Sequence, residues 1–318
     1  MTQRILYRLQ PWEFVDRLVY ESCPAEFEIV PLARDASAED RHAKLAEADF
    51  IMGSWVTTAV TLNEDDFRAA RKLKLVQVMS AGYEHLDLDL AARYGVPVAH
   101  FGDAMASTVA EHTLMLILAL LRRLPQLDAA VRAGKWRTGE PPMYELRGKR
   151  VGIVGLGLIG REVARRLQAF DAELVYHQRH SLDVDLPYLP LDELLSTSDV
   201  VTLNVPISAS THHLIGAREL GLMKPGALLI NVSRGPVVDE AALLAALQAG
   251  RLAGAALDVL EQEPPDTANP LLALDNVILT PHDAGSSAEV WPRVIANCFA
   301  NIQRVARGEP PQNLAVKY

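Results

Sequence analysis

The amino-acid sequence predicts an α/β protein of two domains, each a doubly wound parallel sheet with helices on both faces. Its 318 residues are enough for two domains of ordinary size, and a hydrophobic fraction of 49% can supply two buried cores. Short apolar runs alternate with amphipathic stretches in two series, one before residue 100 and one after residue 150. Alternation of strands and helices is typical of parallel sheets covered by crossover helices.

The first series comprises buried strands expected at 27–31, 50–52, 75–79 and 96–99, with helices near 38–48, 64–72 and 86–94. A long apolar helix follows at 107–124. We expect Pro125 to interrupt or bend it, because proline clashes with the preceding helical turn. A polar segment at 134–149 contains glycine and proline, which predicts a connecting loop.

The second series predicts strands at 151–154, 173–177, 200–203, 227–232, 255–257 and 277–280. Helices are expected at 161–170 and 241–249. Gly250 is a plausible stop for the second of these helices. A last helix near 286–307 is expected to return to the first domain.

Composition argues against several classes of partner. The net charge of -9 disfavours nucleic acid and anionic membrane, because phosphate groups attract basic surfaces. The two cysteines, Cys23 and Cys298, form no CxxC motif, so neither a disulfide framework nor a cysteine-based zinc site is expected. The longest apolar run, 113–121, is far shorter than the ~20 residues of a membrane span, and no signal-peptide pattern opens the chain. We therefore expect a cytoplasmic protein without a metal.

A strand, a G-x-G-x-x-G turn and a helix follow one another in VGIVGLGLIG, residues 151–160. Gly155 allows the tight turn, Gly157 lets the backbone approach a pyrophosphate, and Gly160 lets the helix pack on the strand. Leu158 and Ile159 of the turn are also expected at the cofactor, and the N-terminal N–H groups of the following helix can hold phosphate. The motif predicts a bound dinucleotide, although glycine turns also serve packing alone.

The tip of the next strand bears on which nicotinamide cofactor is bound. An acid there would bind the ribose hydroxyls of NAD and repel the 2′-phosphate of NADP. The tip carries Gln178 and Arg179 instead, and a guanidinium is suited to phosphate. We therefore favour NADP over NAD. The alternative is that Arg179 is a solvated loop charge.

Three chemistry-bearing residues follow three predicted strands of the second series: Arg234 after 227–232, Glu263 after 255–257, and His282 after 277–280. The carboxyl ends of parallel strands share one edge of a sheet, where ligands of such folds bind. Arg234 can bind the carboxylate and keto oxygen of a 2-keto acid. His282 can exchange a proton with the substrate oxygen, and Glu263 can orient the imidazole and favour its protonated form.

These motifs together resemble the D-2-hydroxyacid dehydrogenase family along nearly the whole chain. The stretches that carry the resemblance are Thr108-Val-Ala-Glu-His112, the three glycines of the 155–160 turn, Ser233-Arg-Gly-Pro-Val-Val-Asp-Glu240, Asp258-Val259, Glu263-Pro264 and Thr280-Pro-His282.

The resemblance implies two Rossmann-like domains with the active site in the cleft between them. Residues 1–102 plus 286–318 would form the substrate (catalytic) domain and 103–285 the dinucleotide-binding domain. It also implies a homodimer built on the nucleotide domains. Thr108 would lie near the cofactor, Pro206 would shape the nicotinamide side of the pocket, and Asp258 would lie near the nicotinamide carboxamide.

A substrate loop is implied at 80–87, where backbone N–H groups of Ala81 and Gly82 would hold the substrate carboxylate. An ordinary strand-to-helix turn is the alternative. Two departures from relatives bear on the site: Glu84-His85 replaces the commoner Asp-Asn pair, and Asp283 follows His282. Asp283 could favour protonation of His282 further, or point to solvent. The pair His212-His213 has no metal-ligand pattern around it and is expected at a solvated helix start.

The sequence thus predicts a hydride-transferring NAD(P)-dependent oxidoreductase acting on a small 2-keto or D-2-hydroxy acid. A glyoxylate/hydroxypyruvate-type reductase that prefers NADPH is the first hypothesis. A catalytically weak, nucleotide-sensing protein resembling the corepressor relatives is the alternative, and turnover of any 2-keto acid distinguishes the two. Oxidation of phosphite or formate is disfavoured, since Ala81 stands where phosphite-oxidising relatives carry lysine. An amino-acid dehydrogenase would require ammonia.

Overall fold

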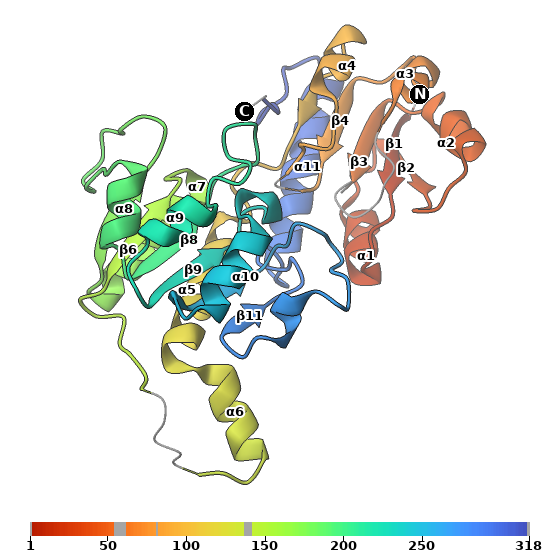
Figure 1. Ribbon diagram of the computed structural model, residues 1–318. Coiled ribbons are helices and arrows are strands. Elements are labelled where there is room, and N and C mark those ends of the chain that lie inside the picture. Colours follow the sequence, from red (N-terminus) through yellow and green to blue (C-terminus); the bar gives the residue numbers. More distant parts are fainter. Residues whose placement is uncertain (1, 54–61, 81, 137–141, 317–318) are drawn as a thin grey trace. The chain divides into compact units, whose positions relative to one another are not determined.

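The computed structural model describes residues 2–53, 62–80, 82–136 and 142–316 (Figure 1). The chain forms two compact units, one of Met1–Met105 with Ser287–Tyr318 and one of Ala106–Ser286. The sequence-based ranges were 1–102 plus 286–318 and 103–285. Each unit contains one parallel sheet, which confirms the predicted fold class of two α/β domains. The assignment of substrate and cofactor to separate units stays a prediction.

The first unit is built on a sheet with the strand order β2-β1-β3-β4-β5. Its strands are β1 (Gln3–Arg8), β2 (Phe27–Leu32), β3 (Phe50–Gly53), β4 (Leu75–Val78) and β5 (Val98–Ala99). Its helices are α1 (Glu13–Ser22), α2 (Ala38–Leu45), α3 (Glu64–Ala69), α4 (Leu88–Arg93) and α11 (Val290–Ala306). Helix α11 packs on β4 and α1, so the last helix returns to the first sheet as expected.

The sequence-based prediction missed β1 and α1. Strand β1 has charged residues near both ends, so its sequence does not have the pattern of a buried strand. It is buried in the structure because β2 and β3 pair with its two edges. Its Tyr7 is fully buried and donates to the carboxylate of Asp16 on α1 at 2.7 Å. Helix α1 buries only Val15 and Val19, which lie one turn apart. Such a narrow apolar face gives a weak helical pattern in the sequence.

The second unit is built on a sheet with the strand order β11-β10-β9-β8-β6-β7, in which all pairings are parallel. The six predicted strands are all present: β6 (Arg150–Val154), β7 (Glu173–His177), β8 (Val200–Leu203), β9 (Ala227–Asn231), β10 (Leu252–Leu257) and β11 (Val277–Leu279). The chain order reverses between β6 and β8, which makes that point the topological switch of the sheet.

Helices cover both faces of this second sheet (Figure 1). Helices α5 (Ala106–Arg122) and α7 (Leu158–Leu167) pack together on one face. The opposite face carries α8 (Leu191–Thr197), α9 (Ala217–Leu222) and α10 (Glu240–Gln248). The sequence analysis missed α8 and α9, which are short and bury few side chains: Leu194 and Leu195 in α8 and Leu220 in α9. Most of their stability therefore comes from packing on the sheet.

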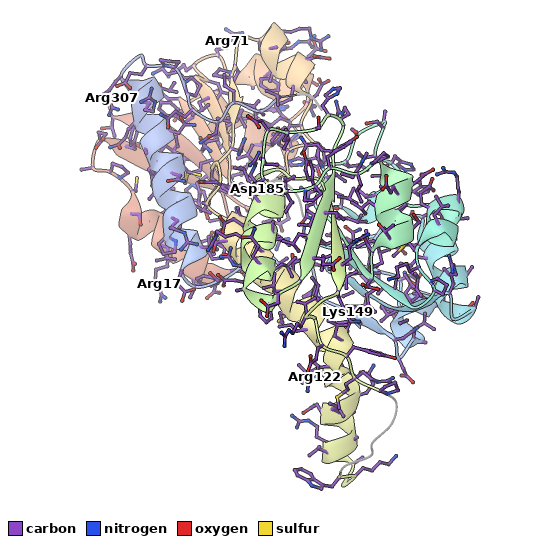
Figure 2. All side chains as sticks on the ribbon, turned by 90° about the vertical axis from the view of Figure 1, so that its left-hand side faces the viewer. Arg17, Arg71, Arg122, Lys149, Asp185 and Arg307 are labelled. Atoms are coloured by element: carbon purple, nitrogen blue, oxygen red, sulfur yellow. The ribbon has the colours of Figure 1, made fainter. Side chains whose placement is uncertain are left out.

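The long apolar helix ends earlier than Pro125 would suggest. Arg123 adopts a left-handed conformation with φ of 53° and separates α5 from α6 (Leu124–Arg132), whose first turn contains Pro125. Figure 2 shows Arg122 at this junction and α6 running on away from the second sheet. In the described part of the chain, no helix is long and apolar enough to cross a membrane.

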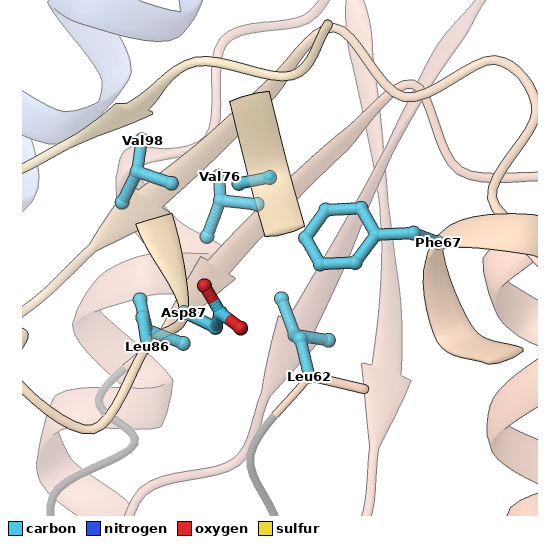
Figure 3. Close-up of a pocket in the computed structure, with 7 residues that line it drawn as sticks. Leu62, Phe67, Val76, Leu86, Asp87 and Val98 are labelled. Atoms are coloured by element: carbon cyan, nitrogen blue, oxygen red, sulfur yellow. The ribbon is translucent and has the colours of Figure 1, made fainter. Parts of the chain in front are cut away.

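A small pocket in the first unit lies among β4, β5, α3 and α4 (Figure 3). Its lining is apolar except for Asp87, whose carboxylate caps α4 by accepting the N–H of Leu90 at 2.9 Å. The Asp87 carboxylate is thus already used by the fold. The pocket is a packing feature that includes Leu86 and Asp87, the last two residues of the predicted substrate loop, and none of the three predicted catalytic residues.

Candidate active site

The three predicted catalytic residues follow three neighbouring strands of the second sheet. Arg234 comes three residues after β9, Glu263 six residues after β10, and His282 three residues after β11. The strand order places β9, β10 and β11 side by side and parallel. All three residues therefore belong to loops at one edge of the sheet, as the sequence predicted.

His282 and Glu263 are in direct contact. The imidazole Nδ1 lies 2.6 Å from Oε2 of Glu263, and each side chain is about one-third exposed, at 33% and 35%. The other carboxylate oxygen, Oε1, accepts the backbone N–H of Leu260 at 3.0 Å. Burial alone would raise the pKa of Glu263, but the hydrogen bond and charge of His282, the Leu260 N–H and the charge of Arg234 bring this pKa below its usual value. The pair is therefore arranged to keep the carboxylate charged beside the imidazole.

The backbone at His282 is strained, with φ of 58° in the left-handed region. Its N–H donates to the carbonyl of Asp258 at 2.8 Å. The carboxylate of Asp258 accepts the hydroxyl of Thr280 at 2.6 Å and the N–H groups of Asp283 and Ala284 at 3.0 Å each. These four hydrogen bonds fix the turn and hold His282 in a backbone conformation that it would otherwise avoid.

Asp258 holds the 280–284 turn, and its expected place beside the nicotinamide carboxamide stays a prediction. Its side chain is buried, and both carboxylate oxygens accept hydrogen bonds from the 280–284 turn. His112 of α5 extends this network, with Nε2 3.1 Å from the Thr280 hydroxyl and 3.7 Å from the Asp258 carboxylate. The sequence motifs include Thr280 and His112, but they did not predict that these two residues contact each other. Asp283 contributes its backbone N–H, and the residue is exposed.

Two hydrogen bonds to neighbouring residues position Arg234, one through its backbone carbonyl and one through its guanidinium. The side-chain amide of Asn231, at the end of β9, donates to the Arg234 carbonyl at 2.9 Å, and the Arg234 guanidinium donates to the Ser233 carbonyl at 2.7 Å. The next residue, Gly235, touches the Glu263 loop so closely that a Cβ there would lie 1.9 Å from the carbonyl oxygen of Leu260. The SRG motif thus needs its glycine for contact between loops, beyond ordinary turn chemistry.

The glycine turn between β6 and α7 has the geometry of a pyrophosphate cradle. Gly155, with φ of 94°, lies against the carbonyl of Asn204, and a Cβ on Gly160 would lie 2.1 Å from the Gly155 carbonyl. By contrast, no described atom lies within 4 Å of the place a Gly157 Cβ would take. Leu158 is exposed and Ile159 half-buried at the helix start. The backbone is therefore open where a pyrophosphate could approach it.

Polar groups beside the turn suit a dinucleotide. Oδ1 of Asn204, which follows β8, is buried and has no hydrogen-bond partner among the described residues. Gln178 uses Oε1 to accept the N–H of Leu156 at 3.1 Å, so its amide occupies the position expected for a ribose-binding acid. Arg179 and Pro206 are exposed. Thr108 is half-buried in the first turn of α5.

The predicted substrate loop belongs to the first unit. Ala81 lies outside the described residues. Gly82 is buried in the turn after β4, and its carbonyl accepts the Ser80 hydroxyl at 2.6 Å. The expected contact of these two backbone N–H groups with a substrate carboxylate stays a prediction.

Comparison with known proteins gives a consistent result. The family model described as "D-isomer specific 2-hydroxyacid dehydrogenase, NAD binding domain" matches residues 114–284. The glyoxylate reductase of Korarchaeum cryptofilum is 40% identical over 262 residues, which cover 80% of this chain and 79% of that protein. The D-3-phosphoglycerate dehydrogenase of Archaeoglobus fulgidus is 37% identical over 81% of this chain but 50% of its own length.

Among solved structures, the NADPH-dependent glyoxylate/hydroxypyruvate reductase of Sinorhizobium meliloti, in complex with NADP and malonate, superimposes with a TM-score of 0.85 at 32% identity. The superposition covers 99% of this chain and 97% of that chain. The likeness therefore extends through both units of the fold.

Proposed function

Because this chain belongs to the D-isomer specific 2-hydroxyacid dehydrogenase family, we propose that it reduces a small 2-keto acid of the glyoxylate or hydroxypyruvate type with NADPH. The observation that carries the proposal is the His282–Glu263 pair, with 2.6 Å between Nδ1 and Oε2, on the sheet edge that also holds Arg234. An acid–base group and a carboxylate-binding cation are what reduction of a 2-keto acid requires. The family alone supports an oxidoreductase, and the substrate and cofactor preference are the proposed part.

When bound, NADPH would supply the hydride that C2 of the keto acid accepts. Protonated His282 donates its Nε2 proton to the keto oxygen, so that the carbonyl becomes a hydroxyl and the imidazole becomes neutral. Glu263 accepts from Nδ1, which fixes the ring and stabilises the imidazolium before the transfer. Arg234 binds the substrate carboxylate and holds C2 in a reactive orientation.

The preference for NADPH rests on the residues at the end of β7. Gln178 is neutral where a carboxylate would repel a 2′-phosphate, and its amide is held by the Leu156 N–H. Arg179 is exposed beside it and offers a guanidinium to that phosphate. Arg179→Ala should raise the KM for NADPH by about tenfold and leave the KM for NADH within about twofold. Equal losses for both cofactors would refute the phosphate contact.

We also propose that a second copy of the chain covers α6. None of its residues is buried, and Leu124, Leu127 and Val131 are exposed apolar side chains on this single helix. Trp136, 77% exposed, follows the helix. Such a concentration of exposed apolar groups is typical of an interface. The double variant Leu124→Glu/Val131→Glu should sediment as a monomer while the wild type sediments as a dimer, and an unchanged dimer would refute the assignment.

The direct test is oxidation of NADPH and, separately, NADH by the purified protein with glyoxylate, hydroxypyruvate, pyruvate and phenylpyruvate. Turnover with NADPH and one or two of the small acids supports the proposal. Turnover with NADH alone would overturn the cofactor preference. Nucleotide binding without turnover of any acid would favour the nucleotide-sensing alternative. Ammonia should leave the rate unchanged, since an amino-acid dehydrogenase would depend on it.

A further inference from the structure

A second histidine–carboxylate pair lies in the loops around the catalytic one. Nε2 of His213 is 2.6 Å from Oε1 of Glu261, and the two side chains are 40% and 35% exposed. Sequence analysis expected His212-His213 at a helix start. In the structure both residues lie in a turn, and α9 begins later, at Ala217. His213 has φ of 50°, a second left-handed histidine at the same sheet edge as His282.

The backbone around this pair ties three loops together. The N–H of His213, in the loop after β8, donates to the carbonyl of Pro236 at 2.7 Å, in the loop after β9. The N–H of Glu261, in the loop after β10, donates to the carboxylate of Glu240 at the start of α10. A Cβ on Gly235 would lie 2.5 Å from that same Glu261 nitrogen. Glu261 is thus a junction between the loops that carry Arg234 and Glu263.

We propose that His213 and Glu261 are positioning residues that hold the 258–263 loop so that Glu263 meets His282. This inference rests on the proposed function of the His282–Glu263 pair. Glu261 lies two residues before Glu263, and the N–H of Leu260, the residue just before Glu261, bonds to the Glu263 carboxylate. A displacement of Glu261 is therefore transmitted over a short, hydrogen-bonded segment to the catalytic carboxylate.

Two physical arguments favour this role over a contribution to stability. An ion pair with both partners more than one-third exposed adds little to the free energy of unfolding, because solvent screens it. A displacement on the order of 1 Å in a catalytic group, by contrast, can lower turnover by as much as about a hundredfold. The pair should consequently affect the chemistry while leaving the melting temperature nearly constant.

The experiment compares Glu261→Gln and His213→Gln in the full-length protein, with His212→Gln as the matched control. His212 is the exposed neighbour whose ring centroid lies 4.1 Å from that of His213, with the two planes tilted by 31°. We expect kcat for keto-acid reduction to fall about tenfold in both test variants and to stay within about twofold in the control. The KM for NADPH should be unchanged, because the glycine turn is untouched.

A readout independent of turnover is the pKa of Glu263, followed by NMR of carboxyl-labelled glutamate. In the wild type, the contact with His282 helps to hold this pKa below its usual value against the opposite effect of burial. Loss of that contact in Glu261→Gln should raise the pKa of Glu263. The removal of a negative charge nearby would by itself lower it. Loss of the contact with His282 and loss of the Glu261 charge therefore shift the pKa of Glu263 in opposite directions.

A rise in the pKa of Glu263 in Glu261→Gln, with the melting temperature within about 2 °C of the wild type, supports the positioning role. An unchanged or lowered pKa overturns it, whatever happens to turnover. If the wild type reduces no keto acid, the proposed function fails, and the NMR measurement still decides whether Glu261 positions Glu263.

Discussion

Replacing Glu263 with glutamine keeps the shape of the side chain and removes its charge. In the wild type the carboxylate accepts two hydrogen bonds, from Leu260 N–H at 3.0 Å and from His282 Nδ1 at 2.6 Å. A glutamine amide has one oxygen and one donor nitrogen, so it can accept from only one of these groups in that arrangement. If the oxygen stays with Leu260, the NH2 group faces Nδ1, and the contact that fixes the imidazole is lost.

The size of the effect follows from these contacts. A hydrogen bond to a charged group contributes about 1.5–3 kcal/mol and a neutral one about 0.5–1.5 kcal/mol. The difference is about 1.5 kcal/mol, and we reduce it to about 1 kcal/mol because the Glu263 side chain is 35% exposed and partly screened. At about 1.4 kcal/mol for each tenfold change, kcat for reduction should fall by about fivefold, and by more where the mismatched donor faces the ring.

The assay is kcat for keto-acid reduction, measured at one fixed pH near neutrality. His282 gives up a proton in reduction and Glu263 holds its ring through Nδ1, so kcat in Glu263→Gln should fall by the factor worked out above. Glu145→Gln, in an exposed loop, removes the same charge without the contact and serves as the control. A Glu263→Gln enzyme with kcat within about twofold of the wild type would refute the assigned role.

Three further changes test the cofactor turn, the His282 turn and a surface ion pair. Gly157→Ala should keep the free energy of unfolding within about 1 kcal/mol, since its Cβ meets no described atom, but weaken NADPH binding measured by calorimetry; unchanged affinity would contradict the cradle. Thr280→Val removes the hydroxyl that donates to Asp258. It should lower the free energy of unfolding in urea by about 1–3 kcal/mol and should also lower kcat; if neither changes, this hydrogen bond is not needed to hold the turn. Hydrogen bonds from two arginines of α7 lower the pKa of Glu162 to about 2. Because this folded-state pKa lies below the unfolded value, the stabilisation is present above the ordinary pKa and is lost as pH falls towards 2. Glu162→Gln should thus cost about 0.5 kcal/mol at neutral pH and nothing near pH 2, and a difference independent of pH would contradict this.

The sequence alone predicted most of the second unit. Its central strands β6, β8 and β9 contain short apolar runs, because a central parallel strand is buried on both faces. The glycine turn could be recognised because its spacing is set by one local structure, strand to turn to helix. Arg234, Glu263 and His282 could be placed at one edge because each follows a strand, and parallel strands end on the same side.

The sequence could not reveal contacts between loops. Asp258 and Thr280 are 22 positions apart, and His112 is 168 positions from Thr280, yet all three meet in one network. No spacing rule links them, since their meeting depends on β10 and β11 being neighbours and on α5 packing over that part of the sheet. For the same reason the sequence did not show that the Asp258 carboxylate binds the His282 turn, and its expected place near the nicotinamide carboxamide stays a prediction.

The sequence by itself thus determined the two parallel sheets, the glycine turn and the three chemical groups at one sheet edge, because local periodicity and strand direction are enough to specify them. The tertiary structure decided how those groups are held: the left-handed backbone of His282, the Asp258 bonds that stabilise it, and the His213–Glu261 pair beside the Glu263 loop. These features depend on the order in which strands pair and on the close contact of Gly235 with the neighbouring loop. Strand order and loop contact are set by packing across the whole unit, and a local pattern of residues does not contain them.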